Sequence, residues 1–238
     1  MRRTSSSAWR VLTHAGLAAL VALASAAADD SVPSPGASLT LRPLAEAGTY
    51  APGRGFTLAI DLAVPNGWHT YWINPGETGM APDVKWRLPP GVALAALHFP
   101  VPQRFDDGVS ISIGYEKHTR LLADFTTTTE VAGALEIGLA AVWMICRESC
   151  QPVTSHATLA LRPENSPPAP TASEAETVAR MCLPQPDTGW KVAVSRSGEH
   201  LIARITPPKT VKIPPVAWPE AWIFPLKTHI IDLAACKA

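Results

Sequence analysis

Residues 135–161, LEIGLAAVWMICRESCQPVTSHATLAL, predict two β-strands joined by a short polar turn. The first part, Leu135–Met144, is apolar and rich in residues that favour strands. The last part, Thr154–Leu161, alternates apolar and polar residues, as a strand does when one face is buried. The polar triplet at 147–149 separates the two strands, and a cysteine flanks it on each side.

Outward from this stretch, short strand patterns end at turn residues. The further strand patterns are Phe56–Val64, Trp68–Ile73, Val84–Leu88 and Arg120–Thr126. Pro-Asn-Gly, Asn-Pro-Gly and Pro-Pro-Gly follow the first three of them and favour turns. Proline makes up 24 of 238 residues, which disfavours long helices. Short strands at this spacing predict an all-β protein with an antiparallel β-sandwich over residues 37–162.

A different composition follows the predicted sandwich. Residues 163–172 are proline-rich and predict a stiff, exposed linker. Ser173 is a suitable N-cap for a short helix that runs to about Cys182. Trp190 to Ile205 predicts two strands around Ser197-Gly198. We therefore expect residues 173–238 to hold a short helix and an incomplete second β region, as in a truncated product or a stand-alone module.

The N-terminus has the pattern of a secretory signal peptide. Arginines precede an apolar run from Val11 to Ala24, and small residues follow it. We expect residues 1–28 to be the signal peptide, with cleavage after Ala26 or Ala28; an uncleaved anchor is the alternative. Lys plus Arg and Asp plus Glu both number 20, and no basic patch points to nucleic acid. The sequence predicts an exported protein without a nucleic-acid partner.

The four cysteines divide into one close pair and two isolated residues. Three residues separate Cys146 from Cys150, which lets the two sulfurs meet if the chain turns. A disulfide that closes so small a ring gains little from restricting the unfolded chain, so we interpret it as a bond meant to open and close. We expect Cys150 to be the more accessible sulfur. Cys182 and Cys236 either pair with each other or stay free.

Neighbouring residues leave other interpretations open. Arg147 would favour a thiolate at Cys146, whereas Glu148 would oppose it. A structural disulfide that ties two strand ends is the plainer alternative, as in a non-catalytic binding or chaperone module. A third alternative is a Cu(I) site, whose ligands would be Met144, Cys146, Cys150 and His156. The aromatic cluster at Trp68, Tyr71, Trp72 and Trp86 is expected to fill the core of the sandwich.

An ordered series of motifs resembles a known family. The motifs are GWHTYWINPGETG at 67–79, PPG at 89–91, FPVPQRF at 99–105, GYE at 114–116 and the Cys146/Cys150 turn. Together they resemble the N-terminal periplasmic domain of the DsbD family, in the branch of the ScsB suppressor-of-copper-sensitivity proteins. The resemblance covers about residues 39–162 and continues weakly at 222–225.

The resemblance implies a fold and a function. The family domain is immunoglobulin-like and periplasmic, and it forms part of a protein-disulfide reductase. Its cysteine pair, here Cys146 and Cys150, receives electrons from a membrane-embedded DsbD-type domain. It passes them to periplasmic thioredoxin-fold proteins of the disulfide isomerase or cytochrome c maturation type, without a cofactor. A mobile cap loop covers the pair and should fall between Phe105 and Tyr115 here. One of these two aromatic residues would shield the sulfurs; core packing is the alternative for each.

Overall fold

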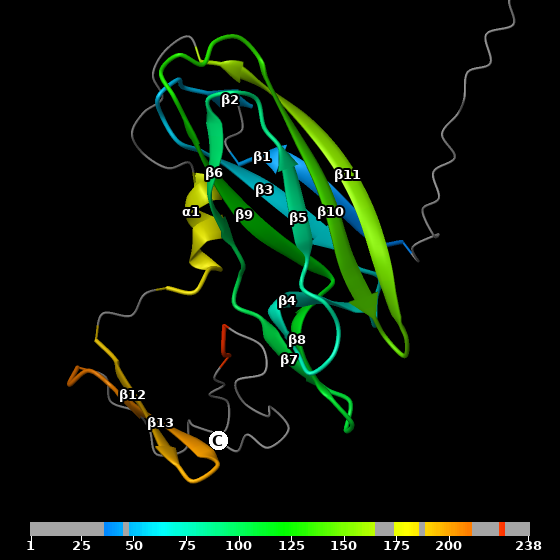
Figure 1. The fold of residues 1–238 in the computed structure, drawn as a ribbon, viewed down its shortest axis with the longest axis vertical. Coiled ribbons are helices and arrows are strands. Elements are labelled where there is room, and N and C mark those ends of the chain that lie inside the picture. The colour runs from blue at the N-terminus through cyan, green and yellow to red at the C-terminus, as the bar shows by residue number, and fades with distance from the viewer. Residues whose placement is uncertain (1–35, 45–47, 165–173, 186–188, 211–223, 227–238) are drawn as a thin grey trace, which may run out of the picture. The chain divides into compact units, whose positions relative to one another are not determined.

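The computed structural model describes residues 36–44, 48–164, 174–185, 189–210 and 224–226. Most of these residues form two β-sheets that pack face to face (Figure 1). The first sheet contains, in spatial order, β1 (Ser38–Pro43), β3 (Phe56–Ala63), β9 (His118–Thr127) and β6 (Val92–His98). The predicted signal peptide, most of the proline-rich linker and Cys236 lie outside the described residues.

The second sheet carries the paired cysteines. In spatial order it contains β2 (Thr49–Tyr50), β11 (Cys150–Pro163), β10 (Leu135–Cys146), β4 (His69–Gly76), β8 (Ile111–Glu116) and β7 (Gln103–Asp106), and β5 (Asp83–Arg87) also pairs with β10. β10 and β11 pair antiparallel from Leu135 opposite Leu161 to Cys146 opposite Cys150. The two long strands therefore run in register into the turn between the cysteines (Figure 1).

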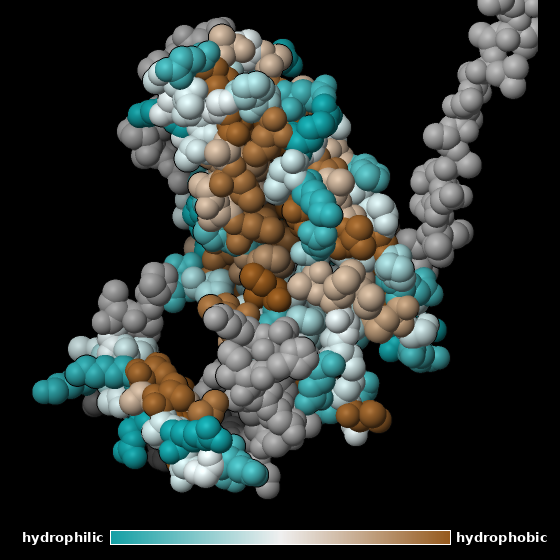
Figure 2. Space-filling view, viewed as in Figure 1, coloured by the Kyte–Doolittle hydropathy of each residue, from teal (hydrophilic) through white to brown (hydrophobic). Residues whose placement is uncertain are grey.

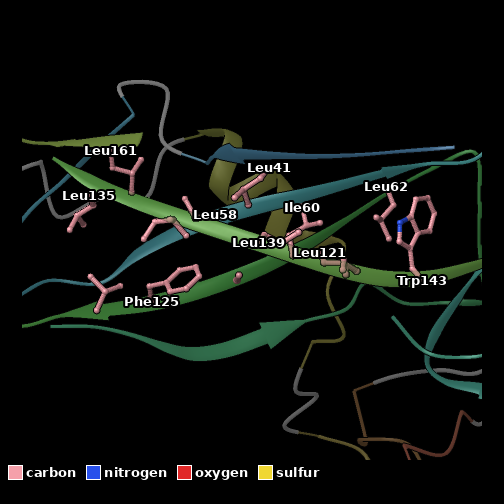
Figure 3. Packing of buried hydrophobic residues seen from close by; sticks show 14 of the residues in the cluster. Leu41, Leu58, Ile60, Leu62, Leu121, Phe125, Leu135, Leu139, Trp143 and Leu161 are labelled. Carbon is pink, nitrogen blue, oxygen red and sulfur yellow. The ribbon is translucent and has the colours of Figure 1, made fainter. Parts of the chain in front are cut away.

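The hydrophobic core lies between the two sheets. Trp143, Ile137 and Ile145 of β10 are fully buried, because residues of one parity on this strand face the other sheet. Leu58 and Ile60 of β3, in the opposite sheet, belong to the same cluster of buried residues (Figure 3). Figure 2 shows further apolar side chains gathered between β5 and β6, where the two sheets end side by side.

These features confirm the predicted all-β, immunoglobulin-like β-sandwich. All six predicted strands of residues 37–162 are present, with their ends shifted by a few residues. Sequence analysis did not predict β1, β2, β6, β7 and β8. β2 and β7 are short and β6 lacks a clear alternation of apolar and polar residues, so their neighbours in the sheet determine their conformation. β1 and β8 do alternate over six residues each, and sequence analysis missed them.

A short helix packs against the outer face of the first sheet. Helix α1 (Glu174–Met181) buries Ala179 against Leu122 of β9. Its Arg180 also donates a 2.7 Å hydrogen bond to Asp124 Oδ1 of the same strand. The predicted pair of strands around Ser197-Gly198 is present as the hairpin of β12 (Lys191–Ser197) and β13 (His200–Thr206). Within the described part of the chain, no helix has the length and hydropathy needed to cross a membrane.

Candidate redox site

A disulfide joins Cys146 and Cys150 across the turn between β10 and β11. The two residues face each other at the end of the antiparallel ladder, and their Cα atoms are 4.1 Å apart. The amide of Arg147 donates a 3.3 Å hydrogen bond to the carbonyl of Ser149, which closes the turn. The predicted proximity of the two sulfurs is therefore present, and the strand register produces it.

The two cysteines differ in accessibility. Cys146 is 3% exposed, whereas Cys150 is an exposed residue. The difference arises because Cys146 is the last residue of β10, which lies inside the sheet, whereas Cys150 follows the exposed residues 147–149. The expectation that Cys150 is the more accessible cysteine is confirmed.

One row of paired residues crosses the second sheet at the disulfide. Glu116 of β8 pairs with His69 of β4, His69 pairs with Cys146, and Cys146 pairs with Cys150. Directly paired residues in adjacent strands project from the same face of a sheet. The His69 and Cys146 side chains therefore share one face, although they lie far apart in the chain with several strands and turns between them.

Tyr71 is the residue that contacts both sulfurs. It lies two positions after His69 on β4, so its side chain projects from the same face. Its hydroxyl donates a 2.7 Å hydrogen bond to Cys146 Sγ and lies 3.4 Å from Cys150 Sγ. The side chain is 1% exposed, and burial raises the pKa of the phenol. The tyrosine therefore stays protonated at neutral pH and can donate to sulfur.

Sequence analysis assigned Tyr71 to the core and missed this contact. Tyr71 is indeed buried, but its hydroxyl faces the disulfide. The only signal in the sequence was its parity with His69 within the motif GWHTYW. That signal was not sufficient, because the neighbouring position of β4 and β10 in the sheet cannot be read from local alternation.

Phe105 lies at the edge of the site in an aromatic stack. Its ring stacks on His69 with 4.7 Å between centroids, and His69 meets the ring of Tyr71 edge-on at 5.2 Å. Burial lowers the pKa of His69, so its ring is neutral at pH 7. Phe105 thus covers His69, which in turn borders the tyrosine at the sulfurs. This position is compatible with a cap, which for Phe105 remains a prediction.

Tyr115 does not shield the sulfurs. It pairs with Thr70, the residue next to His69, so its side chain projects from the opposite face of the sheet. There it packs with Trp72 and Ile113, and its hydroxyl donates a 2.8 Å hydrogen bond to the carbonyl of Pro100. Core packing, the alternative for this residue, is what the structure has. Sequence analysis placed Tyr115 at the end of a cap loop, whereas it is a residue of β8 whose pairing turns its side chain away from the sulfurs.

The charged residues of the turn point along its outside. The guanidinium of Arg147 lies over the ring of Trp68, 5.6 Å from its centroid, and 3.8 Å from the carboxylate of Glu148. Both side chains are more than half exposed. An influence of either charge on a thiolate therefore remains a prediction, and solvent screening reduces it.

The four residues of the alternative copper site do not converge. His156 is an exposed residue of β11 that pairs with Ala140, six positions beyond Cys150. At a rise of about 3.3 Å per residue, its Cα lies roughly 20 Å along the strand from that of Cys150, too far for a shared ion. In the described ranges, no group of three His, Cys, Asp or Glu residues could hold a metal. This corrects the set of Met144, Cys146, Cys150 and His156.

Comparison with known proteins shows which family this chain matches. The family model described as "Thiol:disulfide interchange protein DsbD, N-terminal" matches residues 40–162. The N-terminal periplasmic domain of ScsB from Proteus mirabilis is similar in structure, with 18% identity, a TM-score of 0.53, and coverage of 75% of this chain and 68% of that chain. The reduced N-terminal domain of DsbD from Neisseria meningitidis has 13% identity and a TM-score of 0.33, over 52% of this chain and 85% of that chain. No curated protein matches.

Proposed function

The chain belongs to the family of DsbD N-terminal domains, and on that premise we propose that it relays reducing equivalents through Cys146 and Cys150 in the periplasm. The proposed electron donor is a membrane-embedded DsbD-type domain. The proposed acceptors are periplasmic thioredoxin-fold proteins of the disulfide isomerase or cytochrome c maturation type. A role in copper tolerance would follow if the acceptor serves that process, as the ScsB likeness suggests.

The observation that carries this proposal is the asymmetry of the disulfide. A thiolate from the donor can attack the sulfur of Cys150, an exposed residue, with the sulfur of the buried Cys146 as leaving group. The S–S bond breaks, a mixed disulfide forms at Cys150, and Cys146 leaves as a thiolate. Tyr71 already donates a hydrogen bond to that sulfur and so stabilises the charge that develops there.

The second half of the exchange completes the transfer of two electrons from the donor. The donor's other thiolate attacks its own sulfur in the mixed disulfide and releases Cys150 as a thiolate. The donor dithiol is then a disulfide, and its two electrons reside on Cys146 and Cys150. The same steps in reverse reduce a disulfide of the acceptor, with the Cys150 thiolate as the attacking group.

A purely structural role explains the disulfide poorly. The bridge spans a sequence separation of 4, and the chain-entropy model assigns such a loop about 2 kcal/mol, against about 4.7 kcal/mol for 100 residues. The paired strands β10 and β11 already hold the two residues opposite each other by a continuous ladder. A bridge at this position therefore adds little to the stability of the hairpin.

A redox titration with trapping of the mixed disulfide tests the proposal. We suggest a background in which Cys182 and Cys236 are serine, because Cys182 is an exposed free thiol that could form adducts of its own. The expected reduction potential lies above about −300 mV, because structural disulfides, which resist reduction, have potentials below that value. Cys146→Ser should trap a mixed disulfide with a thioredoxin-fold protein in its oxidised form, because the Cys150 thiolate attacks the partner's disulfide and Cys146 is no longer present to release the partner.

Two results would contradict the relay. One is a reduction potential in the range of inert structural disulfides. The other is that Cys146→Ser, which keeps the accessible Cys150, traps no more partner than Cys150→Ser does. A strong loss of stability on reduction together with either result would favour the non-catalytic module.

A further inference from the structure

The hydroxyl of Tyr71 lies in a chain of three hydroxyl groups that ends at the disulfide. A phenol has one proton to donate, and Tyr71 donates it to Cys146 Sγ at 2.7 Å. Its oxygen can then only accept further hydrogen bonds. Burial raises the pKa of this phenol, and hydrogen bonding with Ser112 and Thr78 lowers it in part. Ser112 Oγ and Thr78 Oγ1 lie 2.9 Å apart, so one of the two hydroxyls donates to the other, and only the second one has a proton left for the phenol oxygen.

Ser112 belongs to this group because of sheet topology. It is a residue of β8, which pairs with β4, and it is 6% exposed. It has the same parity as Gly114, the partner of Tyr71, so both project from the face that carries the sulfurs. The buried hydroxyl finds its partners among the other hydroxyls of this face, as a buried polar group requires.

Thr78 is held in place by the loop that follows β4. The amide of Glu77 donates a 2.9 Å hydrogen bond to the carbonyl of Ile111, and the amide of Ile111 donates one of 2.9 Å to Glu77 Oε2. This reciprocal pair fixes the loop to the start of β8. Gly79 then passes directly over the ring of Tyr71, where an added Cβ would lie 2.1 Å from Cζ. The loop therefore clamps both the ring and its hydroxyl.

We propose that Ser112 and Thr78 are positioning residues that aim the Tyr71 hydroxyl at Cys146 Sγ and thereby favour the Cys146 thiolate. This inference rests on the proposed function, because it concerns the same sulfur. Donation from Ser112 or Thr78 to the phenol oxygen polarises the phenol, and linked hydrogen bonds strengthen one another. The effect is largest when Cys146 carries a full negative charge, which is the state reached when the S–S bond breaks.

The sequence of bonds is balanced without any further reactant. When a donor thiolate attacks Cys150, the electron pair of the S–S bond moves to Cys146 Sγ. Tyr71 keeps its proton and strengthens its hydrogen bond to that sulfur, while the hydroxyls of Ser112 and Thr78 keep theirs. Protonation of the Cys146 thiolate from solvent follows according to its pKa. The hydroxyl chain therefore acts on the leaving group and is not itself consumed.

The pKa of the Cys146 thiol measures this role directly. We suggest the variants Ser112→Ala and Thr78→Val in a protein whose other cysteines, including Cys150, are serine, so that absorbance at 240 nm follows one thiolate. We expect Tyr71→Phe to raise the pKa of this thiol by about one unit or more, because a charge-assisted hydrogen bond is lost. Ser112→Ala should raise it by about half a unit, because polarisation transmits only part of that effect.

A double-mutant cycle separates a positioning role from a general effect. In the Tyr71→Phe background, Ser112→Ala should change the pKa of the Cys146 thiol by less than about 0.2 unit, because the tyrosine carries its effect. Ser155→Ala is the matched control: Ser155 accepts a 3.0 Å hydrogen bond from Trp143 Nε1 in the same sheet. That variant should lose stability but leave the pKa of the thiol unchanged.

The outcomes distinguish this inference from the function on which it rests. An equal shift from Ser112→Ala with and without Tyr71, or no shift from Ser112→Ala and Thr78→Val, would overturn the positioning role. The wild-type disulfide would still exchange with a dithiol partner in that case. If the wild-type disulfide does not exchange at all, the relay itself is refuted, whatever the pKa of the Cys146 thiol.

Discussion

Gly79→Ala is the sharpest perturbation that the structure offers, because it acts on the loop over Tyr71 without changing a polar group. Gly79 has a φ of +87°, a conformation that favours glycine. A Cβ at this position would meet three atoms of the Tyr71 ring at 2.1, 2.2 and 2.6 Å. Ordinary carbon contacts begin near 3.4 Å, so the ring or the loop must move by about 1.3 Å.

Two costs add up in this variant. The left-handed conformation costs an alanine about 1–2 kcal/mol, and overpacking costs a further 1–3 kcal/mol. We therefore expect Gly79→Ala to lower the free energy of unfolding by about 2–5 kcal/mol. A shift of the ring by about 1.3 Å would also displace the Tyr71 hydroxyl from Cys146 Sγ, to which it donates at 2.7 Å, and so weaken that hydrogen bond.

Gly133→Ala is the matched control for this experiment. Gly133 has a φ of +76° and no heavy atom within 4 Å of an added Cβ, so it reports the conformational cost alone. Urea unfolding followed by tryptophan fluorescence gives the two free energies of unfolding, and absorbance at 240 nm gives the pKa of the Cys146 thiol. The reasoning would be refuted if Gly79→Ala were no less stable than Gly133→Ala and had the wild-type pKa at Cys146.

Three further outcomes are expected. Phe105→Ala should raise the pKa of the His69 ring towards its ordinary value, since burial lowers it; an NMR titration showing no rise would contradict the stack. Burial alone raises the pKa of Asp124, but hydrogen bonds, chiefly from Arg180, outweigh it and hold that pKa below 3.8. The ionised carboxylate therefore stabilises the folded protein above about pH 4, and this contribution disappears as the pH falls through the lowered pKa. Arg180→Ala should therefore cost about 0.5–1 kcal/mol in urea unfolding at pH 7 and much less near pH 2, and an equal cost at both would count against the ion pair. Leu58→Ala should cost about 2–5 kcal/mol because its side chain is fully buried, yet leave the reduction potential unchanged; a shifted potential would mean that the core couples to the disulfide.

The errors of sequence analysis at the site share one cause. Tyr71 was expected in a strand of the core and Tyr115 at the end of a cap loop, whereas both are residues of paired strands. Alternation along each strand gives two faces, but it does not say which face meets the cysteines. The pairing of Thr70 with Tyr115 and of His69 with Cys146 decides it, because that register directs Tyr71 towards the sulfurs and Tyr115 away from them.

The three hydroxyl groups of Tyr71, Ser112 and Thr78 are a second case in which strand pairing, not local sequence, forms the site. Ser112 lies outside the quoted motifs, and Thr78 lies in the one at 67–79 with nothing to connect it to a sulfur. The sequence separation is 34 between Thr78 and Ser112 and 75 between Tyr71 and Cys146, so the sequence does not show that these residues are close. Serine and threonine are common in turns and at strand ends, so their identity alone suggests solvent or a cap. They become part of one site only because β8 pairs with β4 and the loop after β4 folds back onto β8.

The sequence by itself determined the class of fold, the position of the cysteine hairpin and the greater accessibility of Cys150. Each of these depends on interactions between residues near in the chain: alternation along a strand, turn residues that end it, and polar residues between two cysteines. The order of strands in the sheet and the loop over Tyr71 were decided by tertiary structure alone. They arise from pairing and packing between distant segments, and those place Tyr71, Ser112 and Thr78 at a sulfur that no local pattern connects to them.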